Sequence, residues 1–288
     1  MRRPSRYIHD DWLGYVPRPS HMEPGLTIDA FGFRYTSQSV HAASSLPSVI
    51  AVGDSFTFGE EVTDLETWPS ILQTRTGRRV INGGVSGYGF DQIVLRAEIL
   101  AEVHNPEFLV VSFIADDIAR TEMRRLWWRN KPWVDVDGGK LQIRGTPVQR
   151  PPAILESARK VERVLRKLGP TAQHCLGYHV RVHPRGTGTL IAAGLIERLA
   201  VLQRRVSTRV VLVAEYDAQV WTSPVIANHQ RKIINEVLEH GSARGIHVLD
   251  SFSLFASARR PDCLYKSWHM NEHGNRMIAS LVAAALAL

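Results

Sequence analysis

Hydrophobic residues along the chain follow two alternating patterns, short continuous runs and longer segments with helical spacing. The short runs, rich in β-branched residues, predict strands at residues 48–53, 78–84, 107–115, 208–216 and 245–251. The segments with helical spacing predict helices at residues 66–76, 90–103, 152–167, 190–206 and 224–240, and from Asn271 onward. Strands that alternate with helices form βαβ units, so the pattern predicts a parallel sheet with helices on both faces.

The first forty residues do not share this alternation. They contain four prolines and the segment LTIDAFGFRYT, which alternates like two strands around a glycine turn. We therefore expect an N-terminal arm (residues 1–40) packed on a main domain (residues 41–288). No Gly-, Pro- or Ser-rich linker and no repeat divides the main domain. Its predicted fold is α/β, with three layers (α/β/α) around a mostly five-stranded parallel sheet.

Composition and charge limit the partners of the chain. It is 44% hydrophobic without a low-complexity tract, which is typical of a globular protein with a substantial core. The formal net charge of +7 fits an anionic partner or substrate, and it equally fits a need for solubility alone. The basic residues are scattered, and no helix-turn-helix, zinc-finger or RNA-binding signature is present. We therefore predict no nucleic-acid partner.

The cysteine content and the length of the apolar runs argue against a disulfide-rich, a metal-binding or a membrane-spanning protein. The two cysteines, Cys175 and Cys263, are too few for a disulfide framework, and no Cys/His cluster has metal-ligand spacing. We therefore predict no metal and no cofactor. No apolar run approaches the ~20 residues of a membrane span. The start, MRRPSRYIHDDWLGY, lacks the hydrophobic region of a secretory signal, so a cytoplasmic location is expected. Nothing in the sequence indicates an oligomeric state.

Polar residues with catalytic potential follow the predicted strands. Gly53-Asp54-Ser55 follows the first strand, NGGVSGYG ends the second, and SFIADDI ends the third. The segment SWHMNEHGNRMIA, with His269, precedes the last helix. The ends of parallel strands converge, so these segments can line one cleft. A serine nucleophile needs a base within hydrogen-bond reach and donors aimed at the oxyanion, which Ser55 and His269 could satisfy. The alternative for Ser55 is a helix N-cap.

From about Ser48 to the C-terminus, the chain resembles the SGNH (GDSL-type) hydrolases. The resemblance lies in the order of four features along the chain: GDS, Gly87, the DDI segment and His269. The resemblance implies the three-layer, flavodoxin-like fold and esterase, lipase, carbohydrate deacetylase or acyltransferase chemistry. It also implies Ser55 as nucleophile and His269 as base. The oxyanion hole would comprise Ser55, Gly87 and Asp116, which occupies the position of the family's asparagine.

Asp116 is the first departure from the family pattern. A carboxylate has no hydrogen to donate and would oppose the negative charge of the transition state. Burial and the neighbouring Asp117 would restore a donor by keeping Asp116 protonated. Alternatively, another residue such as Asn82 supplies the donor.

The second departure concerns the acid that orients the histidine. Three residues before His269, where the family usually has an aspartate, the chain has Lys266. Asp262 is the nearest acid upstream, and we assign it as the triad acid. Otherwise a backbone carbonyl orients the ring, which leaves a Ser–His dyad. Glu60 and Glu61 are interpreted only as charges at a helix start.

Residues for substrate binding are less specific. The stretch RTEMRRLWWRNKPW combines arginines with tryptophans, which suits sugar rings and anionic groups. The preferred interpretation is instead a helix whose tryptophans cover the core. Beside the strand ends, Asp54, Asp117 and Arg120 are assigned to substrate binding.

Three functions fit these residues. The first is a serine esterase that acts on an acyl ester, for example an acetyl ester, of a small molecule or carbohydrate. The second is an acyltransferase on the same fold. The third is a non-catalytic binding module in which Asp116 and Lys266 mark lost chemistry.

Overall fold

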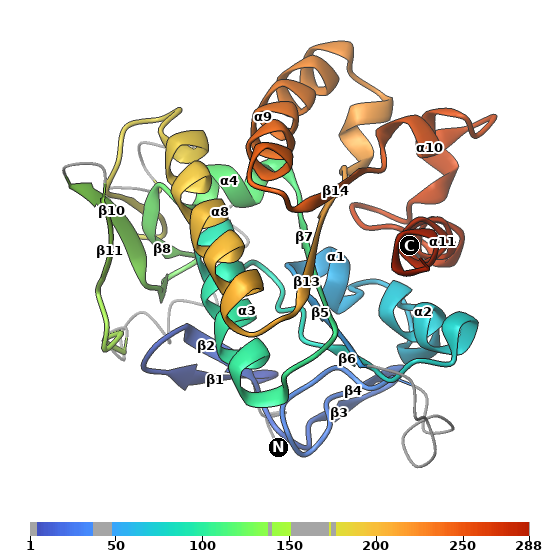
Figure 1. The fold of residues 1–288 in the computed structure, drawn as a ribbon, viewed down its shortest axis with the longest axis horizontal. Helices are drawn as coiled ribbons and strands as arrows, with labels where there is room; N and C mark the ends of the chain where they lie inside the picture. Colours follow the sequence, from blue (N-terminus) through green and yellow to red (C-terminus); the bar gives the residue numbers. More distant parts are fainter. Residues whose placement is uncertain (1–4, 37–47, 138–139, 151–172, 174–176, 288) are drawn as a thin grey trace.

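A five-stranded parallel sheet forms the centre of the protein (Figure 1). The structure, a computed structural model, describes residues 5–36, 48–137, 140–150, 173 and 177–287. In spatial order the strands are β14 (His247–Asp250), β13 (Arg209–Ala214), β7 (Phe108–Phe113), β5 (Val49–Val52) and β6 (Val80–Asn82). All neighbouring pairs are parallel. Numbered along the chain, this order is 2-1-3-4-5, as in flavodoxin-like sheets.

Helices cover both faces of the sheet, which confirms the predicted three-layer α/β/α fold (Figure 1). Ile50 and Val52 of β5 pack into the core formed with α3 (Phe90–His104), α8 (Gly188–Arg205) and α9 (Pro224–Ala243). Val49 and Ala51 pack into the core with α2 (Trp68–Thr76), α10 (Phe252–Ala256) and α11 (Glu272–Leu286). Because successive strand residues point to opposite faces, both sets must be apolar. This explains why the strands read as continuous hydrophobic runs.

The observed helices follow most of the predicted ones. The predicted helix at residues 152–167 lies outside the described residues. Helix α3 begins after Gly89, whose N–H donates to the side chain of Gln92 at 3.2 Å. It ends at His104, and the next residue, Asn105, has a φ of 43°. Within the described ranges, no helix is long and apolar enough to cross a membrane.

The N-terminal segment contains two hairpins, β1 (Tyr7–Asp10) with β2 (Gly14–Pro17), and β3 (Met22–Glu23) with β4 (Leu26–Thr27). The hydroxyl of Tyr88, in the loop before α3, donates to the carbonyl of Tyr15 at 2.5 Å. The amide of Gln92 donates to the carbonyl of Leu13 at 2.8 Å. These contacts favour an arm packed on the domain, although the division at residues 40 and 41 stays a prediction.

The segment between α4 (Ala115–Arg120) and α8 contains small antiparallel sheets that the sequence did not predict. Strands β8 (Met123–Leu126), β9 (Arg129–Asn130) and β12 (Val180–Arg181) form one sheet, and β10 (Trp133–Asp137) pairs with β11 (Lys140–Arg144). The helix expected here is wrong. Trp127 and Trp128 instead form the tight β8–β9 turn, with φ values of 47° and 59°.

Candidate active site

Ser55 is the first residue of α1 (Ser55–Phe58), directly after β5. Asp54 is the N-cap of this helix, because its carboxylate accepts the N–H of Phe56 at 2.9 Å. Asp54, and not Ser55, is therefore the N-cap of α1. The hydroxyl of Ser55 is free to face the cleft at the carboxyl edge of the sheet.

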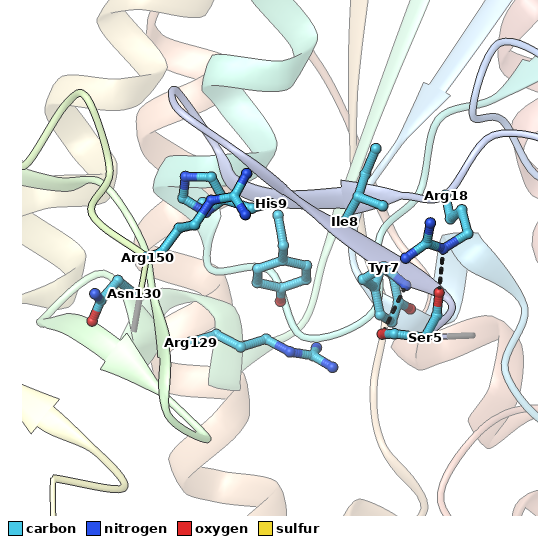
Figure 2. Close-up of a pocket in the computed structure, with 10 residues that line it drawn as sticks. Ser5, Tyr7, Ile8, His9, Arg18, Arg129, Asn130 and Arg150 are labelled. Atoms are coloured by element: carbon cyan, nitrogen blue, oxygen red, sulfur yellow. Dashed lines mark hydrogen bonds between the residues drawn. The ribbon is translucent and has the colours of Figure 1, made fainter. Parts of the chain in front are cut away.

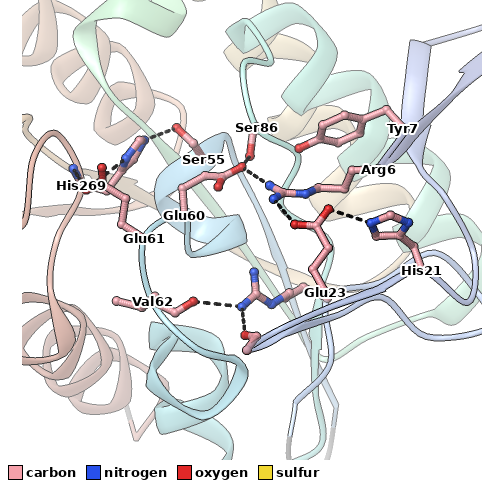
Figure 3. Close-up of polar contacts among 12 residues, drawn as sticks. Arg6, Tyr7, His21, Glu23, Ser55, Glu60, Glu61, Val62, Ser86 and His269 are labelled. Carbon is pink, nitrogen blue, oxygen red and sulfur yellow. Dashed lines mark hydrogen bonds and ion pairs between the residues drawn. The ribbon is translucent and has the colours of Figure 1, made fainter. Parts of the chain in front are cut away.

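His269 reaches this hydroxyl from the loop before α11. Its Nε2 lies 2.9 Å from the Oγ of Ser55 (Figure 3). The ring packs beside Phe56, with centroids 5.1 Å apart. The Oγ also lies 3.2 Å from the carboxylate of Asp54. A hydroxyl has one hydrogen, so Ser55 donates to either His269 or Asp54 at a given moment.

Glu61 holds the loop that carries His269. Its Oε2 accepts the backbone N–H groups of Ser267, Trp268 and His269 at 3.1, 3.3 and 3.3 Å. The same oxygen lies 3.8 Å from the Nδ1 of His269 (Figure 3). Nδ1 has no hydrogen-bond partner among the described residues, so no backbone carbonyl of that part orients the ring.

The backbone and charge of Glu61 fit this position. Its φ of 67° is left-handed, and the ammonium of Lys266 donates to its carbonyl at 2.6 Å. Burial raises the pKa of Glu61, but the hydrogen bonds from the backbone N–H groups of Ser267, His269 and Trp268 outweigh it and leave the pKa lowered. The carboxylate of Glu61 therefore stays ionised at lower pH than the carboxylate of an ordinary glutamate does.

Asp262, the acid predicted from the sequence, is not brought to His269. It is exposed on a 3₁₀ helix, Pro261–Leu264, where it pairs with Arg260 at 2.6 Å. The side chain next to the histidine is Glu61, which sequence reasoning had interpreted as a helix-start charge. The available signal was a second carboxylate in GEEV, six positions after the serine.

Gly87 lies beside Ser55 in the wall of the cleft. Its φ is +82°, which favours glycine. A Cβ at this position would lie 2.5 Å from Cζ3 of Trp127, so a side chain would also collide with the β8–β9 turn. The residue thus leaves its backbone accessible to a substrate.

Asp116 lies at the rim of the cleft on α4. Its side chain is 67% exposed, so the burial considered in the sequence analysis is absent. Its nearest ion pair is with Arg120, at 3.9 Å. Asn82, the alternative donor, is buried and occupied, since its amide nitrogen donates to Thr57 and its oxygen accepts from Gly84, at 3.0 and 3.1 Å.

The three residues assigned to substrate binding form one buried network. The guanidinium of Arg120 lies 2.5 Å from Asp117 and 3.6 Å from Asp54. Both carboxylates are fully buried, whereas Arg120 also lines the cleft. Burial and the charge of Asp54 raise the pKa of Asp117, against the effect of Arg120. Asp54 and Asp117 therefore lie beneath the site and hold Arg120 in place.

Glu215 is a further buried acid at the end of β13. Neither of its carboxyl oxygens has a hydrogen-bond partner among the described residues. Burial, together with the charge of Asp54, raises the pKa of Glu215 well above its usual value. Glu215 is therefore neutral at pH values where exposed glutamates are ionised.

The cleft around Ser55 and His269 has a volume of about 560 Å³. Elements outside the central fold complete its walls: Tyr7 comes from the arm, and Trp127 and Arg129 come from the β8–β9 hairpin. The guanidinium of Arg120 lies over the ring of Trp127, 5.5 Å from the ring centroid. Trp127 therefore contributes to the cleft, whereas Trp128 is buried. Within the described ranges, no group of three or more His, Cys, Asp or Glu residues could hold a metal ion.

Comparisons with known proteins show what the chain is similar to. A model of the GDSL-like lipase/acylhydrolase family matches residues 51–277. An α/β hydrolase from the metagenome of Lake Arreo, Spain, has 13% sequence identity and a TM-score of 0.50, with 85% of this chain and 97% of that chain covered. A Lactobacillus plantarum protein has 15% identity and a TM-score of 0.50, with 85% and 98% covered. The curated proteins contain no match. At such identities the solved structures show a shared fold alone.

Proposed function

Since the chain belongs to the GDSL-like lipase/acylhydrolase family and is an ester-bond hydrolase, we propose that it is a serine esterase that works through an acyl-enzyme. The observation that carries this proposal is the 2.9 Å contact between the Oγ of Ser55 and the Nε2 of His269. Nucleophile and base come from different ends of the chain and meet at the carboxyl edge of the sheet, where α/β proteins bind ligands.

In the proposed mechanism, Nε2 of His269 accepts the proton of the Ser55 hydroxyl while Oγ attacks the ester carbonyl. The backbone N–H groups of Ser55 and Gly87 donate to the oxyanion. His269 then gives the proton to the departing alcohol, which leaves the acyl group on Ser55. A water molecule, activated by the same histidine, releases the acid and restores the serine.

Glu61 is proposed as the positioning residue in place of Asp262. It fixes the backbone of the His269 loop through one carboxylate oxygen. Its charge, 3.8 Å from Nδ1, stabilises the imidazolium that forms when His269 takes the proton. Because the contact is longer than a hydrogen bond, we expect the carboxylate to act mainly through its charge and through the loop.

Asp116 is proposed to lie beside the oxyanion hole without donating to it. Its carboxylate is exposed at the rim, and Asn82 already donates to Thr57. The hole then has two backbone donors instead of the three groups that the family pattern implies.

The tryptophans of the cleft support a substrate with a ring that can stack. Trp127 and Trp268 both line it, and Trp268 is 57% exposed. Aromatic faces pack well against sugar rings, so we propose a carbohydrate-borne ester as the substrate class, with acetyl as the first acyl group to test.

Hydrolysis of p-nitrophenyl acetate and labelling by a fluorophosphonate test this proposal. We expect both with the wild type and neither with Ser55→Ala. Ser223→Ala is the matched control, because Ser223 also lies at the start of a helix, α9, but does not line the cleft. Activity that survives in Ser55→Ala would refute the nucleophile. Labelling without hydrolysis would favour an acyltransferase, and neither reaction in folded wild type would favour a binding module.

A further inference from the structure

A second cavity, of about 540 Å³, lies beside the catalytic cleft. Its walls come from the arm and from the segment that contains the β8–β9 hairpin (Figure 2). Tyr7 and Arg129 line both cavities. The two cavities therefore adjoin at these two side chains.

The lining of this cavity is basic. Arg18, Arg129, Arg150 and His9 contribute to it, and no acidic residue does so among the described residues. None of the three arginines has an ion pair within the described part of the chain. Arginines elsewhere are commonly paired, as Arg198 is with Glu98 at 2.8 Å. His9 lies 3.1 Å from the carboxylate of Asp11, so the positive charge without an ion pair in the described residues comes from the three arginines.

Arg129 is held in a defined position on the shared wall. Its guanidinium lies 4.8 Å from the ring centroid of Tyr7 (Figure 2). It also lies 4.7 Å from the ring centroid of Tyr15. Stacking on aromatic rings leaves the edge of a guanidinium available for hydrogen bonds. The hydroxyl of Tyr15 is itself fixed, because it donates to the carbonyl of Ser86 at 3.0 Å.

We infer that the second cavity is a subsite for an anionic group, a carboxylate, sulfate or phosphate, on the ester substrate. The inference rests on the proposed function, since the group must belong to a molecule whose ester lies at Ser55. Guanidinium groups bind such anions through paired hydrogen bonds. Arg129 lies on the wall shared with the cleft, and Arg18 and Arg150 add positive charge elsewhere on the wall of the second cavity.

Matched ester pairs test the inference. Mono-p-nitrophenyl succinate and p-nitrophenyl butyrate differ by an anion on the acyl side, whereas 4-acetoxybenzoate and phenyl acetate differ on the alcohol side. We expect the wild type to prefer the anionic ester in at least one pair. Arg129→Gln and Arg150→Gln should each reduce that preference about 10–100-fold, the usual effect of a lost charge-assisted hydrogen bond. Arg204→Gln, an exposed arginine on α8, is the control with the same change in net charge.

Direct binding separates this inference from the proposed function. In Ser55→Ala, where no turnover occurs, we expect saturable binding of inorganic sulfate by calorimetry, weakened by a further Arg150→Gln change and unaffected by Arg204→Gln. Arg150 is exposed, so its substitution should not disturb folding even if Arg129→Gln does. The proposed subsite would be refuted if Arg150→Gln left sulfate binding unchanged. It would also be refuted if the wild type hydrolysed both esters of each pair at the same rate. Serine-dependent hydrolysis of the neutral esters would still support the esterase.

Discussion

At the scale of single residues, the carboxylate of Glu61 both holds the backbone of the His269 loop and places a charge near the imidazole ring. Glu61 accepts three backbone N–H groups of this loop. Its own backbone is left-handed, a conformation that costs a non-glycine residue free energy. The contacts to Lys266 and the loop offset this cost.

Substitution of Glu61 by Gln separates its charge from its shape. The amide oxygen can still accept from the loop, but the imidazolium loses a stabilising charge. We expect kcat/KM to fall about tenfold or more, the effect of a partly screened charge at this distance. Asp262→Asn should leave kcat/KM unchanged, and the opposite result would restore Asp262 as the triad acid.

Asp116→Asn tests the composition of the oxyanion hole. The amide adds a donor and removes a charge that repels the transition state. One such donor is worth ~10²–10³ in rate. We expect the variant to keep its fold and to hydrolyse p-nitrophenyl acetate at least as fast as the wild type at about pH 8. A large loss of activity in folded protein would mean that the carboxylate itself is needed.

Glu215→Gln tests the effect of the buried neutral acid on stability. An acid whose pKa is raised on folding stabilises the protein below its unfolded pKa and loses this contribution as the pH rises toward its folded value. As the pH rises above the range in which exposed glutamates ionise, the free energy of unfolding of the wild type should therefore fall relative to the variant. Glu239→Gln, an exposed acid on α9, should show no such trend in urea unfolding.

At the scale of elements, the arm packs through a few buried hydrogen bonds, of which Tyr88 to Tyr15 is one. Tyr88→Phe should lower the free energy of unfolding by about 1–3 kcal/mol, because the buried carbonyl of Tyr15 loses its donor. Tyr35→Phe is the control, since the hydroxyl of Tyr35 has no hydrogen bond among the described residues. Equal stability of the two variants would show that the arm is not held by this contact. Chemical denaturation measures both.

Sequence reasoning succeeded for elements with a strong pattern. The five central strands are continuous apolar runs because both faces are covered, and their spacing by helices indicated the parallel sheet. The strands at residues 123–144 are only 2 to 5 residues long and carry mixed charged and aromatic residues, so no period identified them. Trp127 was therefore assigned to the core instead of the cleft.

At the scale of the whole molecule, the order of residues along the chain predicted which segments meet, but not at what distance. The strand ends converge in any parallel sheet, which brings Ser55, Gly87 and His269 together. The acid beside the histidine depends on a loop conformation that has no local pattern. For that reason the sequence did not predict that Glu61 lies next to His269. It also did not predict the wall between the two cavities, because the arm and the β8–β9 hairpin form that wall together.

The pairing of Ser55 with His269 also has a consequence for how activity arises as the chain folds. The two residues are 214 positions apart, so their contact closes one of the longest loops in the protein. Such long-range contacts form late, because the entropy of loop closure opposes them until other structure has shortened the distance. A folding intermediate that has its sheet but not its docked α11 would hold Ser55 without a base. Hydrolysis should therefore begin only at the last step of refolding, later than the formation of the sheet.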